Sequence, residues 1–424
     1  MQRLLSEFSF DSIWLPPSPS CRMHCCGSQS GDRPCHIVAR SPRLVMTNHR
    51  ADVTHLTMSS DPQVDAPAET PQASASKMAD RSTSRSAAIQ IWIIGALVPL
   101  TFIAIGKVGE YDFAAFWIAA KQAMSGEAAG IYSQAATRSY SDSLGLGGAT
   151  IFPYPPHALF FFIPFALIPY IPAYLAWNAA TAAFFYWAAR PYLPDRFSPI
   201  LAILTPAALI CLDFGQTGLL FGGLWLLAFR GKWAAVALLT FKPHLGFLAI
   251  LTLRNRRSFG YTVLMALALL VASALLFGPA LWQSFVDHSI NHAAKITTMK
   301  RWLFAAVTPA VGYGLWGWIA FAIVGAMLLA ERLNAFTAAT ASFLISPYGF
   351  HYDMPVVSLG FGLLIFAYWA DMPIRHRVPV AIGFLSPVIA ISGNWWMPPL
   401  LGWALWAQTK YDPGTAIGLP KGIG

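Results

Sequence analysis

The sequence places titratable side chains at the ends of its apolar runs, and one inside such a run. Asp112 follows the first run, in the motif Glu110-Tyr111-Asp112-Phe113. Two carboxylates at such a boundary are either solvated anchors, or one of them is a general base at the membrane mouth. Lys242 lies within a later run, beside Pro243. A lysine in the bilayer costs at least about 2.5–3.5 kcal/mol, so it needs a partner, which is either an acid of this chain or a phosphate entering from the lipid.

Three further segments carry polar groups at the same kind of boundary. Gln216 begins an apolar run after Asp213-Phe214-Gly215, and His351 and Asp353 stand two residues apart after Ser346-Pro347. That spacing suits a base with its orienting carboxylate, or a pair that binds phosphate. Residues 152–157 hold prolines that stiffen the chain, together with His157. A lone histidine is usually structural, although this one could bind a substrate.

The composition indicates the elements that must position these residues. Of the 424 residues, 56% are hydrophobic and 11% are charged, whereas a soluble domain carries about 25% charged residues. Apolar runs such as 91–105, 261–277 and 315–330 have lengths that suit a bilayer rather than strands. Buried helices of a soluble protein would need polar faces that these runs lack. We therefore predict an all-α integral membrane protein with about ten passes.

Basic residues indicate which ends of the runs face the cytoplasm. Arg81 and Arg85 precede the first run, which places the N-terminus there, and most later Lys and Arg residues fall in segments assigned to the same side. This bias accounts for the net charge of +9 without a nucleic-acid partner. The segments predicted to face away from the cytoplasm are 110–150, 279–301 and 346–353, and those predicted to face it are 230–232, 254–257 and 371–377.

Residues 153–190 do not fit a simple crossing. Pro164, Pro169 and Pro172 suggest a broken helix or a partly re-entrant piece. Two full crossings are the competing interpretation, and they would put Arg190 outside.

Residues 233–253 also begin and end at basic, cytoplasmic markers. A stretch of about 21 residues gives two halves of about 15 Å, each reaching halfway through an apolar core of roughly 30 Å. A hairpin of two half-helices broken at Lys242-Pro243 explains this length. Such broken helices usually line a polar cavity.

Three parts follow from these patterns. Residues 1–86 are rich in Ser, Pro, Arg and Asp without an apolar period, and we expect a disordered cytoplasmic tail, with Met78 as an alternative start. Residues 87–410 form the membrane domain, whose large first external loop bears an amphipathic helix at 112–124 along the membrane surface, and 411–424 form a cytoplasmic tail.

Cysteines in the N-terminal tail do not define a metal site. Cys21, Cys25, Cys26 and Cys35 stand near His24 and His36, but their spacing is not a standard zinc-ligand pattern. We expect no bound metal and no cofactor.

The ordered set of motifs resembles glycosyltransferase family 87, whose members include polyprenyl-phosphate-mannose-dependent α-mannosyltransferases of the GT-C class. The resemblance covers about residues 107–370, and the N-terminal tail has no counterpart. His351 is offset from the position where many members have an acidic or histidine residue. The matching residues are Asp112-Phe113 with Phe116-Trp117, Gly126, Ile131-Tyr132, Tyr154-Pro155-Pro156, 165–169 with Trp177, Gly215-Gln216-Thr217-Gly218, Phe241-Lys242-Pro243-His244-Leu245-Gly246, Phe277-Gly278-Pro279, and Ser346-Pro347 through Tyr352-Asp353.

The resemblance implies a GT-C-type helical bundle in the plasma (inner) membrane, with its active site on the extracytoplasmic side. It implies an inverting transfer of a hexose, mannose in this family, from a polyprenyl-phosphate donor to a glycolipid or glycan acceptor. Asp112 would be the catalytic base, and Lys242, Gln216 and His351 would bind the donor phosphate. The other candidates are Tyr154, His157, His244 and Asp353.

A secondary transporter of a lipid or small solute is the main alternative. It accounts for broken helices and an intramembrane lysine, but not for a large external loop that opens on a carboxylate. A non-catalytic membrane scaffold is a third interpretation, and polar residues converging on one side argue against it. An assay of transport into vesicles, compared with an assay of transfer from a labelled polyprenyl-phosphate sugar, distinguishes the transporter from the glycosyltransferase.

The predicted sidedness can be tested with single cysteines at Ser143 and Ser258 in a variant otherwise free of cysteine. We expect an impermeant maleimide added outside intact cells to label the cysteine at 143 and not the one at 258, because segment 110–150 is predicted to face outward and segment 254–257, directly before residue 258, to face the cytoplasm. Permeabilised cells provide the control, in which both sites should react. Equal labelling of both in intact cells would contradict the topology.

Overall fold

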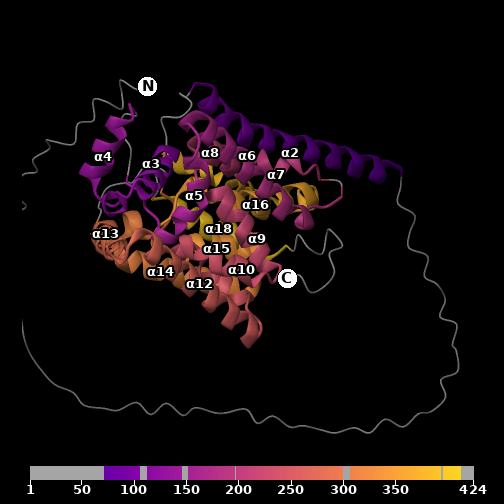
Figure 1. Cartoon of the computed structure of the whole chain (residues 1–424). Coiled ribbons are helices and arrows are strands. Elements are labelled where there is room, and N and C mark those ends of the chain that lie inside the picture. The colour runs from indigo at the N-terminus through magenta and orange to yellow at the C-terminus, as the bar shows by residue number, and fades with distance from the viewer. Residues whose placement is uncertain are drawn as a thin grey trace, which may run out of the picture. The chain divides into compact units, whose positions relative to one another are not determined.

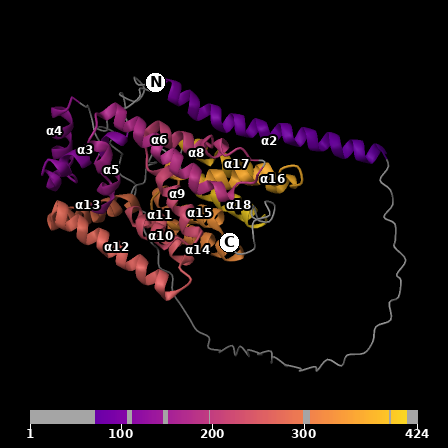
Figure 2. The same ribbon diagram turned by 45° about the vertical axis from the view of Figure 1, so that its right-hand side comes forward.

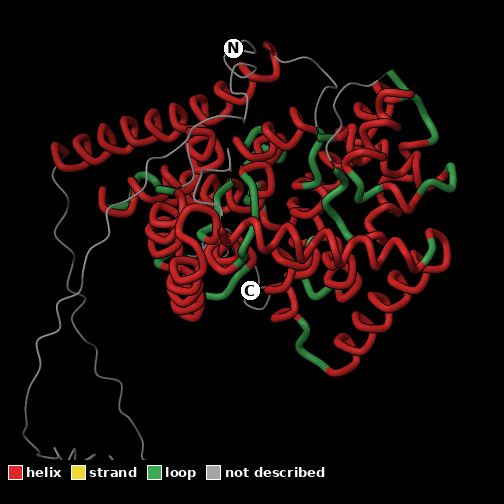
Figure 3. Tube along the Cα trace, turned by 90° about the vertical axis from the view of Figure 1, so that its left-hand side faces the viewer, coloured by secondary structure: helices red, strands yellow, loops and turns green. Residues whose placement is uncertain are grey.

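The computed structural model of the chain describes residues 71–105, 112–145, 151–195, 197–298, 306–392 and 395–411. The expected tail up to residue 70, the cysteine cluster, Glu110 and the C-terminal residues from 412 lie outside the described residues. The secondary structure of the described residues is helical, as predicted, apart from one isolated bridge between Ala306 and Phe350 (Figures 1 and 3).

The first half of the described chain runs from α2 to α9. Helix α2 begins at Pro71, before the expected start of the membrane domain at Ala87. The elements are α2 (Pro71–Ile105), α3 (Phe113–Met124), η1 (Ala128–Gly130), α4 (Gln134–Ser143), η2 (Pro156–Ala158), α5 (Leu159–Ala166), α6 (Tyr170–Ala189), η3 (Arg190–Tyr192), α7 (Ile200–Ile203), α8 (Pro206–Phe214) and α9 (Gly218–Phe229).

The second half runs from α10 to α18. Its elements are α10 (Trp233–Leu238), η4 (Leu239–Phe241), α11 (Pro243–Gly246), η5 (Phe247–Thr252), α12 (Arg256–Phe277), α13 (Pro279–Thr298), α14 (Ala310–Glu331), α15 (Ala335–Ile345), η6 (His351–Asp353), α16 (Pro355–Tyr368), α17 (Ile374–Ile389), η7 (Ala390–Ser392) and α18 (Met397–Thr409).

The chain is a multi-pass membrane protein. Three of the described helices are long and apolar enough to cross a bilayer, in segments Ser84–Thr101, Arg256–Phe277 and Ala310–Glu331, and a fourth crossing is possible if the bent pair α5–α6 is one span. The sequence predicted about ten passes. Other apolar stretches among the described residues, such as α9, α15 and α16, are shorter helices whose side chains are largely buried.

The break expected in residues 153–190 separates α5 from α6. The two segments meet at an angle of 115°. Pro169, which caps the N-terminus of α6, adopts ψ 153° and so leaves the helical region there. The structure therefore has the broken or re-entrant arrangement in place of two straight crossings.

The break expected at Lys242-Pro243 is also present. Lys242 has φ −129° and ψ 67°, between the short helices η4 and α11. A proline disfavours the α-helical region for the residue before it, which is the local reason for the break. The carbonyl of Lys242 accepts hydrogen bonds from Leu245 and Gly246, so a new helix starts directly after it.

The helix predicted at 112–124 is present as α3. It packs against α4, α5 and α6. Most of its side chains are buried, including Phe113, Phe116, Trp117 and Ile118. Aromatic residues of α5 and α6 pack against it; Phe116, for example, lies 4.8 Å from Phe162 between ring centroids.

The segment expected to be an external loop at 279–301 is largely the helix α13. This helix packs against η1 and η2 as well as α12 and α14. Trp282 stacks on His157 at 5.9 Å, and Phe285 and His288 lie against Tyr132. These aromatic contacts hold α13 against the segment that carries Asp112.

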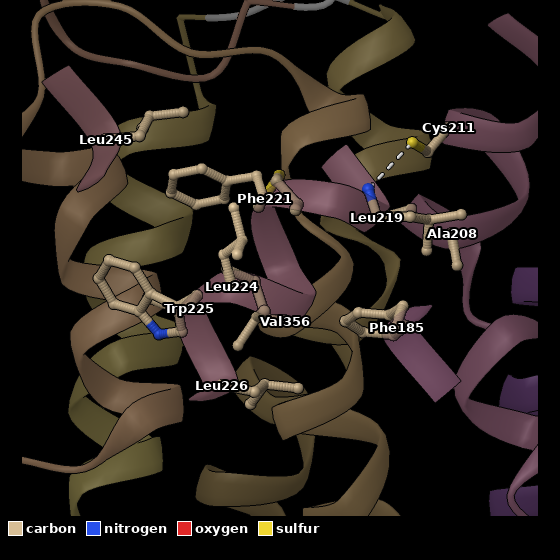
Figure 4. Packing of buried hydrophobic residues seen from close by; sticks show 14 of the residues in the cluster. Phe185, Ala208, Cys211, Leu219, Phe221, Leu224, Trp225, Leu226, Leu245 and Val356 are labelled. Atoms are coloured by element: carbon tan, nitrogen blue, oxygen red, sulfur yellow. Dashed lines mark hydrogen bonds between the residues drawn. The ribbon is translucent and has the colours of Figure 1, made fainter. Parts of the chain in front are cut away.

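The centre of the fold is formed by α8, α9, α15 and α16, with α2 lying along α8 and α17 (Figure 2). Figure 4 shows its apolar packing, in which Phe185 and Val356 lie near α9, the helix that carries Leu224 and Trp225. The thiol of Cys211 accepts a hydrogen bond from the Leu219 N–H at 3.3 Å, which ties the end of α8 to the first turn of α9. This packing fixes the turn between α8 and α9.

Two glycines bring that turn close to its neighbours. Gly215 ends α8 with φ +60°, in the left-handed region that favours glycine. A Cβ there would lie 2.7 Å from the Cβ of Phe113. A Cβ on Gly218 would overlap the carbonyl oxygen of Tyr352. Absent side chains at both positions therefore let α3 and η6 approach the same turn.

We expect Gly218→Ala to lower the unfolding temperature in detergent, because overpacking against a backbone atom typically costs about 1–3 kcal/mol. Gly260→Ala is the matched control, since Gly260 lies in α12 and a Cβ there meets nothing within 4 Å. Differential scanning fluorimetry of the purified variants compares the two. Equal unfolding temperatures would show that η6 does not depend on this close approach.

Candidate functional site

Five polar side chains from separate segments form the candidate site. Asp112 stands at the start of α3, Tyr154 precedes η2, Gln216 lies in the turn between α8 and α9, Lys242 occupies the break before α11, and Asp353 ends η6. Hydrogen bonds link the first three, and an ion pair links the last two. All five were candidates from the sequence.

The carboxylate of Asp112 is half-buried and bound to an amide. Its Oδ2 accepts a hydrogen bond from Nε2 of Gln216 at 2.6 Å. Asp112 occupies the N-cap position of α3 with helical φ and ψ, and its side chain does not cap the helix. The carboxylate is therefore aimed at the α8–α9 turn.

The hydroxyl of Tyr154 connects Gln216 to its neighbour. It donates to Oε1 of Gln216 at 3.3 Å and lies 2.8 Å from Oγ1 of Thr217. The carbonyl of Tyr154 accepts from the hydroxyl of Tyr132. A buried network of this kind restricts its members to one arrangement.

Lys242 forms an ion pair with Asp353, and both side chains are almost completely buried, with exposures of 3% and 5%. The ammonium group also faces the rings of Tyr154 and Tyr352 at 5.1 and 5.8 Å from their centroids. The second oxygen of Asp353 accepts from the N–H of Phe350 at 3.2 Å. An acid of the chain itself is therefore the partner that Lys242 requires, while an ammonium has three donors and can bind a further anion.

Electrostatics couple the two halves of the site. Burial raises the pKa of Asp112, while the hydrogen bond from Gln216 and the charge of Lys242 lower it and the charge of Asp353 raises it. A carboxylate whose pKa lies above its usual range is a better proton acceptor at neutral pH than an ordinary aspartate. Asp112 thus combines the location and the basicity of a general base.

The three candidate histidines lie around this centre rather than in its polar network. His157 stacks on Trp282, and its Nε2 lies 3.2 Å from the hydroxyl of Thr240. His244 is half-buried, with its ring 5.9 Å from that of Tyr348.

From the sequence, His351 and Asp353 were predicted to be either a base with the carboxylate that orients it or a pair that binds phosphate. In the structure Asp353 binds Lys242, whereas His351 packs against Phe214 and Tyr352. Burial lowers the pKa of His351 to about 3, so its imidazole is neutral at physiological pH. It can donate or accept a hydrogen bond there but does not supply a positive charge.

Three contributors were not identified as site residues from the sequence. Thr217, Tyr352 and Tyr132 all belong to the matched motifs, but their roles depend on contacts between distant segments. The only local signal for a role of Tyr352 was its position directly before Asp353. Among the described residues no group of three or more His, Cys, Asp or Glu side chains could hold a metal ion.

Residues 152–347 match the model of glycosyltransferase family 87, and the chain therefore carries a glycosyltransferase family 87 domain over these residues. This confirms the resemblance found from the motifs. No curated protein and no solved structure matches the chain. The match includes Tyr154, Gln216 and Lys242, whereas Asp112 and Asp353 flank it on either side.

The Lys242–Asp353 pair predicts a specific pattern of stability. Lys242→Met should destabilise the protein strongly, because removal of one partner of a buried pair typically costs about 3–5 kcal/mol. Lys242→Met combined with Asp353→Asn should recover much of that loss, since no charge is left unpaired and the asparagine oxygen can still accept from Phe350.

Unfolding temperatures of the two single variants and the double variant in detergent measure this coupling. Lys410→Met is the control, because Lys410 pairs with Glu331 at 2.6 Å in an exposed position where ion pairs contribute little. A double variant that is as unstable as the sum of its singles would exclude the pair as a stabilising unit.

Proposed function

We propose that the chain is an inverting glycosyltransferase that moves a hexose from a polyprenyl-phosphate donor to a glycolipid or glycan acceptor at the extracytoplasmic face of the plasma (inner) membrane. The observation that carries the proposal is that a buried cation, Lys242, and a half-buried carboxylate, Asp112, are linked through Tyr154 and Gln216. The family domain supports the reaction class.

Asp112 is the proposed base. The acceptor hydroxyl transfers its proton to Asp112 while its oxygen attacks the anomeric carbon of the sugar. The bond between that carbon and the phosphate oxygen breaks, and polyprenyl phosphate departs with the bonding electrons. Attack and departure on opposite faces invert the anomeric centre.

Lys242 is the proposed site for the phosphate. A phosphate is a good leaving group, so a cation can replace the general acid that glycoside hydrolysis requires. An ammonium in a water-poor site stabilises the developing negative charge strongly. Asp353 keeps Lys242 charged and in place, and the third ammonium proton, beyond those directed to Asp353 and Tyr154, remains for the phosphate.

Contacts among segments support the proposed side of the membrane. Helix α13 packs on η1, so two segments predicted to face outward, 279–301 and 110–150, lie together. Glu331 pairs with Lys410, which directly precedes the predicted cytoplasmic tail 411–424. Asp112 and Asp353 lie in segments that the basic residues assign to the extracytoplasmic side.

The donor sugar follows from the family resemblance, which implies mannose. Membranes containing the protein, incubated with labelled polyprenyl-phosphate-mannose, should form a labelled glycolipid or glycan. Polyprenyl-phosphate-glucose is the comparison donor. Uptake of the labelled lipid into vesicles without any glycosylated product would support a transporter and contradict the proposal.

We expect Asp112→Asn to lower the rate of transfer at least about a hundredfold, because a general base contributes about 10²–10⁴-fold. Folding should survive, because the Asp112 side chain is only half-buried and the oxygen of asparagine can still accept the hydrogen bond from Gln216.

The matched control is Asp142→Asn, an exposed carboxylate in α4 of the same segment. Its transfer rate should stay near that of the unmodified protein at equal folded concentration. If Asp112→Asn keeps most of its activity, Asp112 is not the base, and Asp353→Asn becomes the variant to compare.

A further inference from the structure

Gln216 contacts the proposed base directly. Its side chain is 4% exposed, and Nε2 donates to Asp112 at 2.6 Å. On the other end of the same amide, Oε1 accepts from the backbone N–H of Thr217 and from the hydroxyl of Tyr154, both at 3.3 Å. The amide therefore joins a carboxylate on one side to two donors on the other.

This arrangement fixes which way the amide points. If its oxygen and nitrogen were exchanged, the carbonyl oxygen would face the carboxylate of Asp112, and its NH₂ group would face the N–H of Thr217. Two acceptors would then oppose each other on one side, and two donors on the other. The backbone N–H of Thr217 thus directs the N–H of Gln216 to Asp112.

The backbone around Gln216 is held as firmly as its side chain. Its N–H donates to the carbonyl of Cys211 at 2.9 Å, directly after the left-handed Gly215. The hydroxyl of Tyr174 donates to the carbonyls of Leu212 and Asp213, at 2.8 Å each. A rigid turn of this kind can position a side chain on a separate helix.

We propose that Gln216 is a positioning residue for the base, which holds the Asp112 carboxylate in its ionised form and in one orientation. The inference rests on the proposed function for the role of Asp112. It differs from the role suggested by the sequence, in which Gln216 would bind the donor phosphate. One of the two amide N–H groups that could meet a phosphate is directed to Asp112.

The charged and titratable groups that face Asp112 come from several elements. Burial is the largest influence and favours the protonated carboxyl, and the bond from Gln216 is the strongest influence in the opposite direction, ahead of the charge of Lys242. The negative charge of Asp353 favours the protonated form of Asp112. The phenols of Tyr170, Tyr348 and Tyr352 also lie near enough to interact with Asp112.

Removal of the N–H donor should therefore raise the pKa of Asp112. A hydrogen bond to an ionised group corresponds to a shift of about one pH unit or more. Gln216→Met has nearly the same size and lacks the donor. A lipid-soluble carbodiimide reacts with protonated buried carboxyls, and mass spectrometry of the peptide containing Asp112 gives the midpoint of labelling against pH.

We expect the midpoint for Asp112 in Gln216→Met to rise by about one pH unit. The acid limb of kcat/KM for sugar transfer should move upward by the same amount, because the base must be ionised to accept a proton. Gln216→Glu tests the site a second way, since a second carboxyl beside Asp112 should raise the midpoint further.

Tyr174→Phe is the matched control. It removes hydrogen bonds to the carbonyls of the same turn and keeps the hydrogen bond from Gln216 to Asp112, so the midpoint should not move even if stability falls. The inference is overturned if the midpoint is unchanged in both Gln216 variants, or if it moves equally in Tyr174→Phe. Labelling does not require turnover, so it remains informative if the protein transfers no sugar, and that outcome would count against the proposed function alone.

Discussion

The ion pair between Lys242 and Asp353 is the interaction on which the arrangement of the site depends. A buried ammonium requires a counter-charge, and its partner lies on η6, far along the chain. To reach Lys242, the backbone of η6 must pass directly over Gly218, where only a hydrogen can be accommodated. The same turn presents Gln216 to Asp112. One electrostatic requirement thus brings five segments together.

The two aspartates of the site have different environments and therefore different chemistry. Asp353 is bound by an ammonium and by a backbone N–H, so its negative charge is compensated. Asp112 is bound by an uncharged amide, and burial raises its pKa. Burial therefore favours the uptake of a proton by Asp112. This division supports Asp112 as the base and Asp353 as the residue that keeps Lys242 in place.

The family domain and the geometry contribute separately to the functional argument. The domain covers the phosphate side of the proposed site, with Tyr154 and Lys242. Asp112 precedes the domain in the sequence and Asp353 follows it. The folded chain brings Asp112 into contact with Gln216 and Asp353 into contact with Lys242, two residues of the domain. The proposal of a lipid-phosphate donor therefore depends on joining residues that lie within the family match to residues outside it.

The sequence by itself determined the membrane class, the helical fold and the family, because low charge, long apolar runs and ordered motifs are properties of the chain read in order. It also located the break at Lys242, since a proline restricts the residue before it. Only the tertiary structure decided the partners. The burial of α3, the helix at α13, the pairing of Lys242 with Asp353 and the contact of Gln216 with Asp112 all depend on packing between segments far apart in sequence. Residue type and local spacing do not determine contacts between distant segments. The chemistry of each candidate residue was therefore predictable from the sequence, and the residue that it contacts was not.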